Sequence, residues 1–118
     1  MPNGARENLV PFFFGGERVR RGTTATNTFA VDVDLRDATV FVSYEQDGEV
    51  IIEKTGDDLT ITEDSVSLDL TQEDTLAFRP GKVFIQLRYV TAGGAADASN
   101  IISTTFERII KDGVIEYV

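Results

Sequence analysis

Alternating apolar and polar residues run through most of this 118-residue chain and predict β-strands. Residues 65–70 alternate strictly, with Val66, Leu68 and Leu70 on one face. Residues 28–35 and 82–90 repeat this period of two, which is that of a strand with one buried face. The inward positions predicted for these two segments are Phe29, Val31, Val33 and Leu35, and Val83, Ile85, Leu87 and Tyr89.

Two runs rich in β-branched and aromatic residues, 40–45 and 50–54, flank the pair Asp47-Gly48. Asp-Gly between such runs predicts a tight β-hairpin, because both central positions need positive φ, which Asp tolerates and Gly favours. The face that each residue of this hairpin takes stays open.

The segment 71–78 predicts a short helical connection. Thr71 is a good N-cap, the acids Glu73 and Asp74 suit the positive end of a helical turn, and the residues 79–81 end it. A short strand is expected near Leu59, a flexible loop over 91–97, and a last long strand over 100–110.

About seven strands separated by turn signals every ~8–12 residues predict an all-β fold, an antiparallel immunoglobulin-like β-sandwich with one short helical turn. A barrel remains the main alternative, and the absence of long amphipathic helices excludes a parallel βαβ fold. The length fits one domain. We divide it into an N-terminal arm or first edge strand (1–22), the sandwich (23–110) and an apolar tail (111–118).

The chain contains no cysteine and no histidine, which removes the commonest nucleophile, general base and zinc ligands. Paired carboxylates could still catalyse glycoside hydrolysis. With 20 acidic residues, however, chance proximity of two carboxylates is uninformative. We therefore expect a protein that is not an enzyme and needs no cofactor.

A formal net charge of −9 disfavours binding to nucleic acid and to anionic lipid, because like charges repel at long range. The polar first residues do not resemble a signal peptide, and no apolar run approaches the ~20 residues of a spanning helix. These features predict a soluble protein made in the cytoplasm.

Several short segments occur in a specific order, among them Asp37-Ala38-Thr39, Leu70-Thr71-Gln72-Glu73 and Pro80-Gly81-Lys82. Over about residues 24–106, this series resembles the N-terminal immunoglobulin-like domain of upper baseplate proteins from tailed phages and prophages. The resemblance implies a structural virion protein that docks to other virion subunits, with a homo-oligomer as one option. No receptor-binding module follows the sandwich in this sequence, so its position within a virion stays open.

Both ends of the chain carry more apolar residues than a strand with one buried face requires. Either one of these runs is an edge strand packed on both sides, or the ends contact neighbouring subunits. We prefer the second interpretation, partly because the resemblance implies assembly. The predicted interface residues are Leu9, Val10, Phe12, Phe13, Phe14, Ile109, Ile110, Val114, Ile115, Tyr117 and Val118.

Three further features of the sequence give weaker indications of function. The basic cluster 18–21 predicts a solvated turn, with an acidic partner surface as the alternative. Asp32 and Asp34, with an acid of the turn 56–58, could bind Ca²⁺, but their spacing is more typical of a solvated face. A different function, a loop-based carbohydrate- or peptide-binding module of a bacterial surface or secreted protein, lacks an aromatic platform, since the chain has no Trp.

Overall fold

The computed structural model describes residues 18–31 and 33–118. That part of the chain forms nine strands, one short α-helix (α1, Gln72–Leu76) and one 3-10 turn (η2, Gly56–Asp58). The strands are β1 (Arg18–Arg20), β2 (Ala25–Ala30), β3 (Thr39–Gln46), β4 (Glu49–Thr55), β5 (Leu59–Ile61), β6 (Ser65–Leu70), β7 (Gly81–Val90), β8 (Ala96–Ala98) and β9 (Ile102–Glu107).

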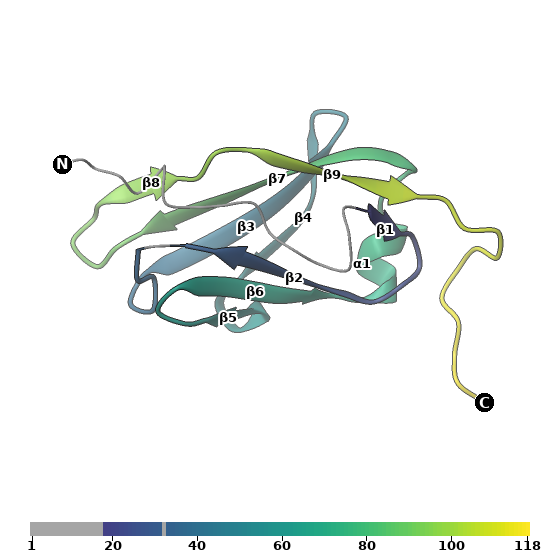
Figure 1. Cartoon of the computed structure of the whole chain (residues 1–118), viewed down its shortest axis with the longest axis horizontal. Helices are drawn as coiled ribbons and strands as arrows, with labels where there is room; N and C mark the ends of the chain where they lie inside the picture. Colours follow the sequence, from purple (N-terminus) through teal and green to yellow (C-terminus); the bar gives the residue numbers. More distant parts are fainter. Residues whose placement is uncertain (1–17, 32) are drawn as a thin grey trace.

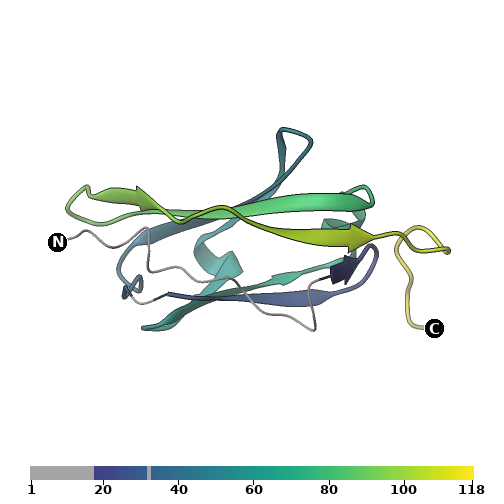
Figure 2. The same ribbon diagram turned by 45° about the horizontal axis from the view of Figure 1, so that its top comes forward.

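The strands form two sheets that pack face to face (Figures 1 and 2). The larger sheet has the order β1-β9-β7-β3-β4, with β8 also paired to β7, and the smaller sheet has the order β2-β6-β5. The second, fifth and sixth strands thus lie opposite the third, fourth, seventh and ninth, which is the arrangement of an immunoglobulin-like sandwich. The predicted fold class is confirmed.

The first strand differs from the sequence prediction. The basic cluster is not a solvated turn, because β1 pairs in parallel with β9 at the edge of the larger sheet. Its single apolar residue, Val19, is only 3% exposed, and the flanking arginines Arg18 and Arg20 point outward. The burial of Val19 and the pairing with β9 make this segment a strand, although most of its residues are polar.

The predicted hairpin is confirmed. Strands β3 and β4 pair across the turn Asp47-Gly48, whose φ angles of 54° and 84° are both in the left-handed region. The buried Gln46 side chain, at the end of β3, bonds the backbone just before β7 begins. Its Nε2 donates to the Arg79 carbonyl at 2.7 Å, and its Oε1 accepts from the Arg79 N–H at 2.8 Å.

The predicted helical turn is confirmed as α1, with Thr71 as its N-cap. The Asp74 N–H donates to Thr71 Oγ1 at 3.0 Å, and the Thr71 N–H donates to Asp74 Oδ2 at 2.9 Å, which completes a capping box. Lys54 of β4 donates to the same Asp74 oxygen at 2.8 Å. The helix is therefore tied to the edge of the larger sheet as well as capped.

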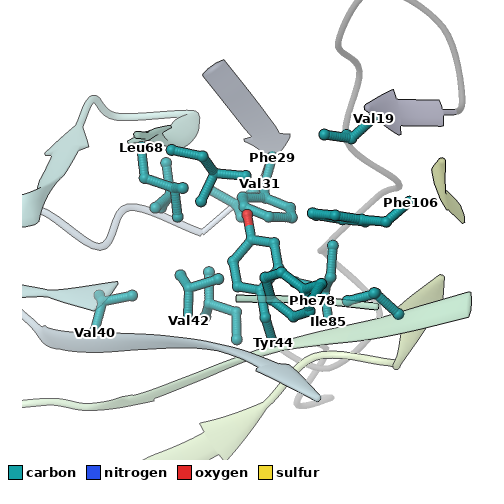
Figure 3. Packing of buried hydrophobic residues seen from close by; sticks show 14 of the residues in the cluster. Val19, Phe29, Val31, Val40, Val42, Tyr44, Leu68, Phe78, Ile85 and Phe106 are labelled. Atoms are coloured by element: carbon teal, nitrogen blue, oxygen red, sulfur yellow. The ribbon is translucent and has the colours of Figure 1, made fainter. Parts of the chain in front are cut away.

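Apolar side chains from both sheets and from α1's C-terminal flank fill the space between the layers (Figure 3). The Phe78 ring lies 4.5 Å from the Phe106 ring and 6.2 Å from the Tyr44 ring, centroid to centroid. The predicted inward positions of β6 and β7 are buried, except for Tyr89, which is half-buried.

One buried pair is polar. Asn27 on β2 donates from Nδ2 to the hydroxyl of Tyr44 on β3, so the bond joins the two sheets through the core. Figure 3 shows this hydroxyl pointing from its own layer toward Phe29 and Val31 of the other. Burial raises the pKa of Tyr44, although the hydrogen bond with Asn27 opposes the shift, so the hydroxyl stays neutral.

Three predicted element limits are wrong. Strand β2 ends at Ala30, because the chain beyond turns at Asp34, whose carboxylate accepts from the Arg36 N–H. The last strand spans Ile102–Glu107 rather than 100–110. The loop predicted over 91–97 contains the start of β8, whose junction with β9 is held by Ser99, with its Oγ accepting from the Leu87 N–H at 3.0 Å.

Candidate protein-docking site

The C-terminal tail, residues 108–118, follows β9 without forming a helix or strand. It lies at the end of the sandwich that carries α1, opposite the end that carries β8 (Figure 1). Three of its apolar residues are almost fully exposed: Ile110 at 92%, Tyr117 at 102% and Val118 at 109%. Val114 and Ile115 are about half exposed. Five of the predicted interface residues thus face solvent in the isolated chain.

Ile109 is different, because it packs against the sandwich. A Cβ built on Gly22, in the turn between β1 and β2, would lie 2.8 Å from Ile109 Cδ1 and 3.4 Å from Leu76 Cδ2. The glycine has a φ of 77°, so this turn is unfavourable for other residues on two counts. Ile109 is therefore the point at which the tail is seated on the domain.

Two polar side chains hold the tail further along. Gln72, the first residue of α1, pairs with both backbone groups of Ile115: its Nε2 donates to the carbonyl at 3.0 Å, and its Oε1 accepts from the N–H at 2.9 Å. Arg21 lies 3.4 Å from the Asp112 carboxylate and donates from Nε to the Phe78 carbonyl at 2.6 Å. The tail's backbone is fastened while its apolar side chains stay outside.

The remaining five predicted interface residues lie outside the described residues: Leu9, Val10, Phe12, Phe13 and Phe14. Their role in docking stays a prediction. So does the division of the chain into arm, sandwich and tail.

The outer face of the larger sheet carries a second candidate surface that the sequence analysis missed. A shallow hollow of about 440 Å³ opens on it. Its lining residues come from β3, β4, β7 and β8: Phe41, Ser43, Val50, Glu53, Arg88, Tyr89, Val90 and Ala96. The signal available in the sequence was apolar residues on both faces of two segments, 40–45 and 82–90.

The hollow combines apolar walls with one available cation. Val50 is 61% exposed, although it is a large aliphatic residue. Arg88 stands directly opposite Phe41 in the β3–β7 register, on the outward face. Within residues 18–31 and 33–118, no carboxylate forms an ion pair with Arg88; Glu53, which also lines the hollow, accepts from the Ser43 hydroxyl at 3.2 Å. An exposed arginine beside apolar groups suits an acidic and apolar ligand.

The acidic residues considered for a cation do not form a site. Asp34 instead pairs with Arg36, whose hydrogen bonds and charge lower the pKa of the Asp34 carboxyl. No group of three or more acidic, cysteine or histidine side chains in the described ranges is placed to hold a metal ion. Asp32 lies outside these ranges. No described helix has the length and apolar character needed to cross a membrane.

Comparison with known proteins assigns no family to the chain. No protein-family model matches the chain, and no curated protein matches it. Among solved structures, CopC from Methylosinus trichosporium OB3b is similar with a TM-score of 0.47 and 11% identity over 86% of this chain and 99% of that one. The fibronectin type-III domain of human fibronectin type III domain containing protein 3 has a TM-score of 0.46 and 10% identity over 92% and 93%. Similarity this low carries no functional argument.

Proposed function

We propose that this chain is a non-enzymatic structural component of a phage or prophage virion, which acts by docking to other subunits. The observation that carries the proposal is the C-terminal tail. Its backbone is fixed to α1 by Gln72, whereas Ile110, Tyr117 and Val118 remain exposed. Large apolar side chains held outside a folded domain are typical of a surface that a partner covers.

The second support comes from the distribution of polar chemistry. The most buried polar groups described, such as the Asn27–Tyr44 pair and the Gln46 amide, join structural elements to one another. At the surface, Gln72 and Arg21 likewise join the tail to the sandwich. These contacts build a rigid body that positions an apolar segment, which is what a docking module requires.

The loop-based binding module gains less support. The loops at the β8 end of the sandwich, 33–38, 62–64 and 91–95, contain no aromatic residue. Carbohydrate-binding loops usually present aromatic faces, and here the exposed apolar groups lie on the tail and the sheet face instead.

The proposal is tested by following the chain into particles. The bacterial strain that encodes it would express an epitope-tagged full chain or a version that lacks residues 110–118, and tailed particles would be purified after induction. Ile109 is retained because it packs on the turn at Gly22. We expect the full chain in the particles and at least a tenfold lower amount of the truncated chain.

A thermal melt of the truncated chain, expected to remain cooperative, separates loss of docking from loss of folding. Tyr117→Asp provides a milder variant, because its side chain is fully exposed. Purified particles that lack the full-length chain would contradict the proposal.

A further inference from the structure

We propose that the hollow on the outer face of the larger sheet receives the tail of a second copy of this chain. In this contact, Val114, Ile115 and Tyr117 meet the apolar walls, and Glu116 pairs with Arg88. The inference rests on the proposed docking function and specifies its partner. It joins the two surfaces described above, the tail beside α1 and the hollow on the outer face of the larger sheet.

The chemistry of the two surfaces is complementary. The hollow offers Phe41, Val50 and Val90 around a guanidinium that no described carboxylate pairs. Beyond Asp112, which is bonded to Arg21, the tail offers apolar side chains on both sides of the Glu116 carboxylate, and all of them are exposed. A carboxylate–guanidinium pair inside an apolar rim would attract the tail and also fix its register in the hollow.

The sizes also agree. The hollow's volume of about 440 Å³ is within the range of sites that hold a few side chains, which is what residues 114–117 would place there. Its open shape suits an extended segment lying across strands. The exposed fraction of Val50 shows that the near wall is free to be covered.

Geometry requires that the tail comes from another molecule. Gln72 fastens Ile115 beside α1, whereas Arg88, the proposed partner of Glu116, lies opposite Ala98 of β8. Residues 116–118 reach at most about 10 Å beyond the anchor, whereas β7 alone covers about 23 Å between Gly81 and Arg88. The contact is therefore heterologous, head to tail, and repeats into a ring or an open chain of subunits.

The global charge limits the strength of the contact. Each copy carries a net charge of −9, so two copies repel at long range while the Arg88–Glu116 pair attracts locally. Association is therefore expected at high rather than low protein concentration.

A binding titration tests the inference. The probe is a fluorescein-labelled peptide of residues 109–118, and fluorescence anisotropy follows its binding to the full chain. We expect saturable binding that Arg88→Glu weakens at least tenfold. Val50→Asp should weaken it as well, because it puts a charge on the apolar wall. Lys82→Glu makes the same charge change on the same sheet face outside the hollow and should leave the affinity within twofold.

A charge exchange gives the sharpest result. A peptide with Glu116→Lys should bind the native chain at least tenfold more weakly and regain affinity for the Arg88→Glu chain. Absence of saturable binding, or equal losses with Arg88→Glu and Lys82→Glu, would overturn the inference. The particle experiment stays independent: a chain that enters particles but does not bind the peptide docks to a different subunit, and only this inference then fails.

Discussion

At the scale of single residues, side-chain amides and hydroxyls make the connections that the strands cannot make alone. Asn27 and Tyr44 link the two sheets, Gln46 holds the backbone at Arg79, and Gln72 holds the backbone at Ile115. Each of these polar groups bonds a segment distant in sequence. Because a buried polar group without a partner is costly, the Asn27 and Gln46 links also select one arrangement of the elements they join.

The Asn27–Tyr44 link has a measurable consequence. In Tyr44→Phe the ring still fills the core, but the Asn27 amide loses its hydroxyl partner, and its Oδ1 already lacks one within the described part of the chain. We expect the free energy of unfolding to fall by about 1–3 kcal/mol, measured by chemical denaturation.

Tyr89→Phe is the matched control, because it removes the same atom from a half-buried ring that makes no described hydrogen bond. Its unfolding free energy should change by less than about 0.5 kcal/mol. Equal effects of the two substitutions would show that the link between the sheets contributes nothing specific.

Such residues mark the limit of the sequence analysis. The alternation correctly placed Val66, Leu68 and Leu70 in the core, because apolar side chains reveal their face by period alone. It could not place Asn27 or Gln46, which are polar and yet buried. Their partners lie 17 and 33 residues away, and no local pattern encodes a bond of that kind.

At the scale of elements, α1 is the point where three parts of the molecule meet. Its capping box ends on Asp74, Lys54 of β4 bonds the same carboxylate, and its first residue holds the tail. Burial raises the pKa of Asp74, but the hydrogen bonds from Lys54 and Thr71 outweigh it, so this pKa lies below its ordinary value of 3.8. The carboxylate therefore stabilises the fold in its charged form.

The sign of the pH dependence follows from this direction. A carboxyl group whose pKa is lower in the folded state stabilises the fold above pH 3.8, and the contribution is lost as the pH falls through the folded pKa. Asp74→Asn should therefore lower the unfolding free energy by about 1–2 kcal/mol at neutral pH. The deficit should shrink as the pH falls below 3.8, measured by urea denaturation from pH 7 to pH 2.5.

Asp57→Asn, at an exposed acid of η2, is the control and should show a small effect at every pH. A deficit for Asp74→Asn that stays constant down to pH 2.5 would mean that the charge of Asp74 does not stabilise the helix connection.

The elements themselves were predicted better than their ends. The Asp47-Gly48 turn and the Thr71 cap are local signals, and both elements were found where these signals stand. The basic cluster 18–21 was interpreted as a turn because three of its four residues are arginines, although a first edge strand within residues 1–22 was one of the alternatives. The pairing that makes it a strand depends on β9, far along the chain. The last strand was predicted too long because Ile109 and Ile110 look like strand residues, although the first packs on a turn and the second is exposed.

At the scale of the whole molecule, the protein is a sandwich with an exposed apolar segment beside α1 and a hollow on the outer face of the larger sheet, which we propose receives that segment from another copy. The tail's exposure was predicted only as an excess of apolar residues, because periodicity cannot tell an edge strand from a docking segment. The hollow was not predicted at all, because it needs side chains from four strands on one outer face. Assembly by repeated head-to-tail contact is the property that this arrangement suggests.

The most direct test is the solution mass of the purified chain, measured by light scattering over a range of protein concentrations. We expect a mass that rises above the 13.0 kDa monomer as concentration increases, and a constant monomer mass when residues 110–118 are removed. A full chain that stays at 13.0 kDa throughout, or a truncated chain that associates equally well, would contradict this expectation.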